Sequence, residues 1–168
     1  SPFAPEIVAV KAGRLMLEEI ADSVQRGESF ALETTLSGLG YLRHIRQWQA
    51  QGYAVSLFFL ALPDVEQAIA RVAERVRQGG HHIPEPVIRR RFLAGRTHFD
   101  QHFREAVDDW SLYSNASGSP VLLEWGERAS PAGATRDDAQ SGNPDQRAAP
   151  AAMHRPASAA VQAALPHP

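Results

Sequence analysis

The apolar run from Tyr53 to Leu62 constrains the fold more than any other feature of this sequence. Nearly all of its residues are apolar, so neither face of the segment is expected to be solvated. Strands that are buried on both faces occur almost only in parallel sheets covered by helices. The run therefore predicts a central strand of a mostly parallel α/β sheet.

Helical patterns and shorter strands alternate along the rest of the chain. Apolar residues recur at helical spacing over residues 6–26, 42–48, 65–76 and 88–107. Short strands are predicted at 29–35, 110–113 and 121–125. Alternation of this kind predicts an α/β fold with flanking helices, in which any ligand site lies at the C-terminal ends of the strands.

The composition changes near residue 127. From there the chain is rich in Ala, Pro, Ser, Gly and Gln and has almost no large apolar residues, so it cannot bury enough surface to offset its chain entropy. We therefore predict one domain over 1–126 and a disordered Ala/Pro-rich tail over 127–168. Within the tail, the alanine-rich stretch from Ala157 to Leu165 follows Pro156, a sequence that allows transient helix.

Charge and cysteine content narrow the function classes. The 168 residues carry a formal net charge of -2, which gives no general attraction to nucleic acid or to anionic lipid. The basic cluster from Arg89 to Arg91 is a local exception without a recognised nucleic-acid motif. The chain has no cysteine and no apolar run of bilayer length, so we expect a cytoplasmic protein without nucleic-acid or membrane partners.

The first candidate site follows the strand predicted at 29–35. The run from Glu33 to Gly38 brings one carboxylate and three hydroxyl groups out of an apolar strand, as hydrogen bonding to a polar substrate requires. The alternative is that its Thr and Ser side chains only cap the next helix. The spacing alone leaves both interpretations open.

The second candidate site is a set of arginines on either side of Gly79 and Gly80. The two groups are Arg71, Arg75, Arg77 and Arg89, Arg90, Arg91. So many arginines on a mobile segment are suited to binding the oxygens of a phosphate group. The alternative is a solvated surface paired with Glu66, Glu74 and Glu85. A metal site at His81 and His82 is not expected, because adjacent residues rarely converge on one ion.

Several stretches carry a family resemblance. They are Ala12-Gly13-Arg14, Phe30 to Gly38, Gly52-Tyr53, Arg71 to Glu85 and Arg89 to Phe92. In this order they resemble the zeta-toxin-like P-loop kinases over about Ser1 to Trp125, most specifically from Gly79 to Phe92. The resemblance implies an ATP- and Mg2+-dependent kinase fold, whose zeta-toxin members phosphorylate a UDP-amino-sugar.

The resemblance also implies places for individual residues. Substrate-binding positions are Glu33, Thr34 and Thr35 by motif. Catalytic positions in the lid are Arg75, Arg90 and Arg91, and nucleotide-binding positions are Arg71 and Asn115, the latter near the base. The implied partners are ATP, a small-molecule substrate such as a nucleotide-sugar, and an antitoxin or other protein.

The family pattern begins with elements that this sequence does not contain. They are a strand with a G-x-x-x-x-G-K-[ST] loop and a short motif bearing the catalytic aspartate. We therefore expect the chain to be the C-terminal part of the kinase domain, incomplete as a catalyst by itself. The alternative is a non-catalytic remnant that binds a nucleotide or a protein partner.

Overall fold

The computed structural model describes residues 5–128 and 158–164. Its helices are α1 (Pro5–Gln25), α2 (Tyr41–Ala50), α3 (Val65–Arg77), α4 (Glu85–His98) and α5 (Arg104–Ala106), with a π-helical turn, Phe99–Phe103, between the last two. Its strands are β1 (Phe30–Thr34), β2 (Ala54–Ala61), β3 (Asp109–Ser114), β4 (Val121–Glu127) and β5 (Ser158–Ala164). The predicted α/β class and the predicted central strand are confirmed.

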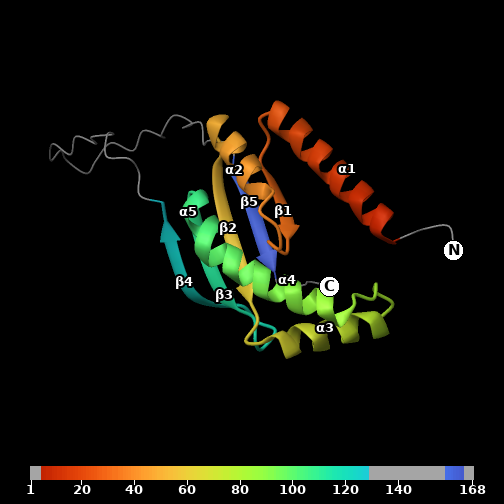
Figure 1. The fold of residues 1–168 in the computed structure, drawn as a ribbon. Coiled ribbons are helices and arrows are strands. Elements are labelled where there is room, and N and C mark those ends of the chain that lie inside the picture. The colour runs from red at the N-terminus through yellow and green to blue at the C-terminus, as the bar shows by residue number, and fades with distance from the viewer. Residues whose placement is uncertain (1–4, 129–157, 165–168) are drawn as a thin grey trace, which may run out of the picture.

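The five strands form one mostly parallel sheet (Figure 1) in the order β1-β5-β2-β3-β4. Strands β1, β5, β2 and β3 are parallel, and β4 pairs antiparallel with β3. The last described strand in sequence, β5, therefore lies between the first two. The C-terminal ends of β1, β5, β2 and β3 meet at one edge of the sheet.

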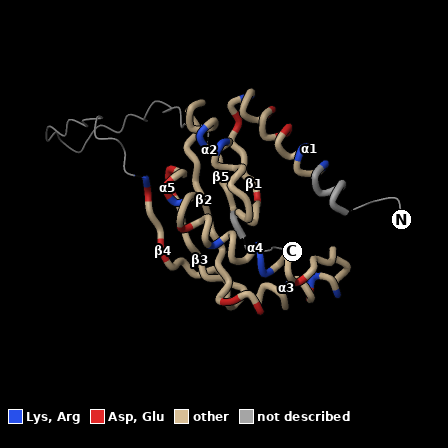
Figure 2. Tube along the Cα trace, in the orientation of Figure 1, with Lys and Arg blue, Asp and Glu red and all other residues tan. Residues whose placement is uncertain are grey.

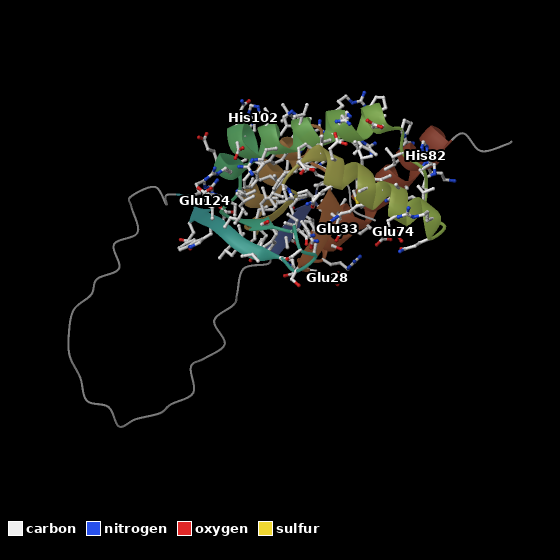
Figure 3. All side chains as sticks on the ribbon, turned by 90° about the horizontal axis from the view of Figure 1, so that it is seen from below. Glu28, Glu33, Glu74, His82, His102 and Glu124 are labelled. Atoms are coloured by element: carbon white, nitrogen blue, oxygen red, sulfur yellow. The ribbon has the colours of Figure 1, made fainter. Side chains whose placement is uncertain are left out.

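Helices cover one face of this sheet. One buried row crosses the four parallel strands in register: Leu32, Val161, Leu57 and Trp110. The ring of Phe30 on this face contacts Trp48 of α2, with 5.0 Å between centroids. The ring of Phe59 contacts Phe99 after α4 at 4.6 Å. In Figure 3 helices α3 and α4 lie on one side of the strands.

The opposite face of the sheet is uncovered in the described part of the chain. Its residues in register are Glu33, Gln162, Phe58, Ser111 and Trp125. The exposed fractions are 37% for Phe58 and 65% for Trp125, which is unusual because parallel sheets are normally buried on both faces. The sheet thus presents an apolar surface of its own.

Local signals explain the start and the end of α3. The Asp64 carboxylate accepts a hydrogen bond of 2.8 Å from the amide of Gln67 and so caps the helix. At the other end Gly79 has φ of 92°, a left-handed conformation that glycine adopts without strain. These two residues set the length of the helix that carries Arg71 and Arg75.

The alanine-rich stretch that allows transient helix forms strand β5 over its described residues, Ser158–Ala164. Its backbone pairs with β1 and β2 on both sides, and this pairing outweighs the helix preference of alanine. The other residues of the predicted tail, 129–157 and 165–168, lie outside the described residues. The remaining predicted elements are present, although the helix expected at 88–107 is interrupted by the π-helical turn.

Candidate functional site

The site predicted at the C-terminal edge of the sheet is built from three segments. They are the loop after β1, the start of α3 after β2, and the residues that follow β3. Helix α3 and the first turns of α4 lie beyond this edge (Figure 1). Lys and Arg positions occur along both helices (Figure 2). Ligands of open α/β sheets bind at such an edge.

The loop after β1 is held in an uncommon conformation. Leu36 has φ of 49°, and its side chain is fully buried. The ring nitrogen Nδ1 of His98 lies 2.8 Å from the Leu36 carbonyl oxygen, and the hydroxyls of Thr35 and Ser37 are 2.9 Å apart. A non-glycine residue with positive φ persists only where its surroundings hold it, so α4 and the core fix this loop.

A cavity of about 330 Å³ lies between this loop, α1 and α2. Hydroxyl groups of Thr34, Ser37 and Tyr41 and the ring of His44 belong to residues that line it, and Gly13 lines it from α1. Burial raises the pKa of Tyr41 above its usual value. Burial, and then the positive charge of Arg43, lower the pKa of His44. The cavity lining therefore has hydrogen-bonding groups and no carboxylate.

The end of β3 carries a buried polar residue. Asn115 is 8% exposed, its amide donates to the Ala61 carbonyl at 2.8 Å, and its own carbonyl accepts a hydrogen bond from the Arg71 guanidinium. The side-chain oxygen Oδ1 has no hydrogen-bond partner among the described residues. A buried unsatisfied acceptor is costly and needs an explanation. A ligand that donates a hydrogen bond to it supplies one.

The arginines on either side of Gly79 and Gly80 differ in the partners that they have in the structure. Arg75 lies in the last turn of α3, and its guanidinium donates to the His81 carbonyl at 3.2 Å. Arg89 is paired with both Glu66 and Glu85 at 2.8 Å. No carboxylate of the described residues pairs with Arg90 or with the half-buried Arg91, so these two cations are free to meet an anion.

The structure brings some predicted site residues together and separates others. Arg71 and Asn115 touch, although 44 positions separate them in the sequence. Thr34 lines the cavity, and Thr35 bonds to Ser37 beside it. Glu33 precedes Thr34 in β1, so its side chain lies on the opposite, uncovered face of the sheet (Figure 3), exposed to solvent.

Sequence reasoning missed other residues of the site. Tyr41, His44 and His98 belong to helices and carry no motif, and in the sequence Leu36 is only one member of the run from Glu33 to Gly38. A hydrophobic residue inside a polar loop is the one signal that pointed to Leu36. The two histidines are found only once the helices are packed.

A larger cavity of about 580 Å³ lies at the other end of the sheet. It is lined by residues of β3 and β4, among them Asp109, Trp125 and Arg128. We place the site at the C-terminal edge because Asn115 and the ordered Leu36 loop are there.

Within the described residues, no group of three or more His, Cys, Asp or Glu side chains is placed to hold a metal ion. Among the same residues, no helix has both the length and the apolar character needed to cross a membrane.

The fold and its edge site define a P-loop kinase-like α/β protein. Residues 4–124 match the family model described as Zeta toxin, and the chain belongs to this family. An uncharacterized protein of Haemophilus influenzae is 28% identical over 92 residues, which cover 55% of this chain. That match spans 66% of the relative's own length. No solved structure matches the chain.

Proposed function

We propose that this chain supplies the nucleotide- and substrate-contacting part of an ATP-dependent kinase that acts on a small molecule such as a nucleotide-sugar. The observation that carries the proposal is the unsatisfied Oδ1 of Asn115, buried at the sheet edge beside Arg71. The exocyclic amino group of adenine is a donor of the kind that this oxygen requires. Membership of the Zeta toxin family supports the same assignment.

The arginines supply the charge that phosphoryl transfer requires. In this reaction a bond forms between the substrate hydroxyl oxygen and the terminal phosphorus of ATP, and the bond from that phosphorus to the bridging oxygen breaks, so that ADP leaves. The proton of the hydroxyl group is released to solvent. Negative charge on the transferred group is stabilised by fixed cations. Arg90 and Arg91 have no carboxylate partner among the described residues, so they are the cations we assign to this role. Arg75 orders the turn that leads to them.

The loop after β1 orients the acceptor. Its cavity of about 330 Å³ is lined by Thr34 and Ser37, from the end of β1 and the loop, and by Tyr41 from α2. Such a lining binds a molecule with several hydroxyl groups and positions one of them. Glu33 faces the uncovered side of the sheet and is therefore assigned only to the outer part of the substrate.

Calorimetric titration of the full chain with ATP tests the proposal, with Arg91→Ala and Arg89→Ala as a matched pair. Arg91→Ala is expected to weaken binding about fivefold to tenfold, the effect of losing one charge-assisted hydrogen bond. Arg89→Ala removes the same charge from a side chain already paired with Glu66 and Glu85, and a smaller effect is expected. Equal effects, or no ATP binding by a folded chain, contradict the proposal.

A second candidate function is the binding of a protein partner, such as an antitoxin, without catalysis. The uncovered face of the sheet favours it, because Phe58, Leu122 and Trp125 expose apolar side chains there. Turnover separates the two functions. ATP binding without transfer to any offered hydroxyl compound supports the non-catalytic candidate.

A further inference from the structure

Helix α4 contacts the loop after β1 through its last residue, His98. The ring nitrogen Nδ1 lies 2.8 Å from the carbonyl oxygen of Leu36. A carbonyl oxygen only accepts hydrogen bonds, so Nδ1 carries the proton and donates the bond. The two residues are 62 positions apart in the sequence. The bond is therefore a tertiary connection between the helix that carries Arg90 and Arg91 and the loop of the candidate site.

The backbone of Leu36 also bonds to a residue of the cavity that we assign to the acceptor. Its amide donates to Oγ1 of Thr34 at 3.3 Å, and Thr34 lines the cavity of about 330 Å³. Because this oxygen accepts from the backbone, the hydroxyl hydrogen of Thr34 remains to be donated to a ligand. Leu36 therefore connects His98 on one side to a cavity hydroxyl on the other.

The backbone conformation of Leu36 explains why the loop needs such a contact. Its φ is 49°, and its side chain is fully buried. A residue with a Cβ atom adopts this left-handed conformation at a cost in free energy, and keeps it only where its surroundings hold it. The next residue, Ser37, also lines the cavity. The direction of the Ser37 hydroxyl therefore depends on the conformation that the contact with His98 supports.

The face of α4 that carries His98 also carries Arg91. The two residues are seven positions apart in one continuous helix, which corresponds to about 700° of rotation, so their side chains leave the helix within about 20° of one direction. They are about 10 Å apart along the helix axis. Gly95 lies between them on this face and is buried. Since His98 contacts the loop after β1, Arg91 lies on the side of α4 that faces this loop.

The neighbouring arginines leave the helix in other directions. By the same geometry Arg89 points about 180° away from His98, and it pairs with two carboxylates at 2.8 Å. Arg90 points about 80° away and is exposed. Arg91 is half-buried and has no carboxylate partner among the described residues. Of the three, Arg91 is therefore the cation whose place over the loop depends on His98.

A π-helical turn, Phe99–Phe103, begins directly after His98. Such turns are rare and occur frequently at functional sites. The rings of Phe99 and Phe103 are fully buried, so the turn anchors this end of α4 in the core. A displacement at the anchored end changes the direction of the whole helix, and it therefore moves Arg91, which lies two turns away.

We propose that His98 is a positioning residue, which holds the hydroxyls of Thr34 and Ser37 and the guanidinium of Arg91 in one arrangement. The inference rests on the proposed function, in which the cavity binds the acceptor and Arg91 stabilises the transferred group. It adds that the two binding events are coupled. An anion at Arg91 favours the position of α4 that keeps the contact, and the contact favours the loop conformation that binds the acceptor. Each ligand therefore strengthens the binding of the other.

Leucine and asparagine at position 98 separate the hydrogen bond from packing. The two side chains have the same branched shape, but only asparagine has an N–H donor at the δ position, where the imidazole has Nδ1. A role in filling space is preserved by His98→Leu, whereas the positioning role is preserved only by His98→Asn. Circular dichroism establishes that each variant is folded. If His98→Leu does not fold, His98→Ala takes its place.

The first measurement needs no ligand. Spin labels are attached to the full chain at Leu39→Cys in the loop and Leu93→Cys on α4, two exposed positions in a chain without other cysteines. Electron–electron double resonance gives the distribution of distances between them. A single narrow distribution is expected with the natural residue, with His98→Asn and with the control His102→Ala, and its loss is expected in His98→Leu. An equally narrow distribution in His98→Leu overturns the proposal, whether or not the chain binds ATP.

The second measurement tests the coupling, with inorganic triphosphate as the probe. Calorimetry gives its affinity, and NMR follows the methyl group of Thr34. With the natural residue, triphosphate is expected to shift this methyl resonance. In His98→Leu the shift should be lost and the affinity should fall about fivefold, and His98→Asn should restore both.

The outcomes of the titration separate this proposal from the proposed function. Triphosphate that binds with equal affinity and shifts the Thr34 methyl group equally in His98→Leu and His98→Asn overturns the coupling. Absence of triphosphate binding to the folded natural chain contradicts the proposed function instead. The spin-label distances then decide by themselves whether His98 positions the loop and α4.

Discussion

The imidazole of His98 holds the main-chain oxygen of Leu36, with 2.8 Å between Nδ1 and that oxygen. This contact joins the end of α4 to the loop after β1, and it accompanies the one positive φ found at a non-glycine residue of the described chain. His98→Ala leaves the carbonyl of a fully buried residue without its partner. We expect the free energy of unfolding to fall by about 1–3 kcal/mol in urea denaturation.

The control for this variant is His102→Ala. His102 is exposed, lies one turn further along and forms no hydrogen bond among the described residues. Its substitution is expected to change the free energy of unfolding by less than about 0.5 kcal/mol. Equal losses for the two variants would show that the contact with Leu36 does not hold the loop.

Asn115→Ala is expected to separate stability from binding. The backbone groups of residue 115 keep their bonds to Ala61 and Arg71, and the substitution removes a buried oxygen that has no partner among the described residues. The free energy of unfolding should therefore stay the same or rise by up to about 1 kcal/mol. ATP affinity should fall about tenfold in calorimetry, because the base loses its acceptor.

Ser117→Ala is the matched control for the Asn115 variant. Ser117 is exposed in the loop that follows and bonds only weakly to Ser119, at 3.4 Å. Removing its hydroxyl group should leave the affinity for ATP unchanged. A large loss of stability for Asn115→Ala would mean that Oδ1 has a structural partner, and would remove the argument for a ligand there.

Gly80→Ala tests the turn after α3, which packs against Arg75 in the last turn of that helix. A Cβ atom at residue 80 would lie 2.5 Å from Cγ and 2.9 Å from the carbonyl oxygen of Arg75. The side chain or the turn must move, so we expect a loss of about 1–3 kcal/mol in the free energy of unfolding. Gly38→Ala, where a Cβ meets nothing within 4 Å and φ is not positive, is the control and should be nearly neutral.

The lowered pKa of His44 makes stability depend on pH. Burial and then Arg43 disfavour the charged ring in the folded protein. As pH falls below about 6.5, the unfolded chain binds a proton at this residue first, so the folded state loses stability until pH reaches the folded pKa. Above about pH 6.5 the ring is neutral in both states, and the folded protein loses no stability from this residue.

This pH effect is isolated as a difference between variants. Denaturation of the natural chain and of His44→Gln is compared from about pH 5 to 8, and the natural chain should lose more stability toward low pH. Arg43→Gln removes the second cause, and it should reduce this slope without abolishing it. Identical pH dependence in the natural chain and His44→Gln would refute the assignment.

Much of the fold follows from local sequence, and the exceptions have a common cause. The strand from Tyr53 to Leu62 is predictable because its hydrophobicity excludes a solvated face. The alanines of β5 favour a helix locally, and only the open edges of β1 and β2 make them a strand. Tertiary pairing of this kind leaves no trace in a window of neighbouring residues.

The candidate site is likewise predictable from the sequence only in part. Motif and spacing point to Thr34, Arg71 and Asn115, but the contact between the last two depends on how α3 packs beside β3. Strand alternation places Glu33 on the face opposite to Thr34, a distinction that a list of polar residues does not make. His98 contacts the loop after β1 from a helix that is distant in the sequence. A histidine with such a role is identified only in the structure.

Chemical-shift mapping by NMR on the full chain tests the central claim, that a nucleotide binds at the C-terminal edge of the sheet. On addition of ATP, the largest shifts are expected at the backbone amide of Asn115 and its side-chain amide, and at the residues from Leu62 to Asp64. The residues around Gly126, at the opposite edge, should stay unchanged. Shifts centred on Gly126, or no shifts in a folded sample, would contradict the account.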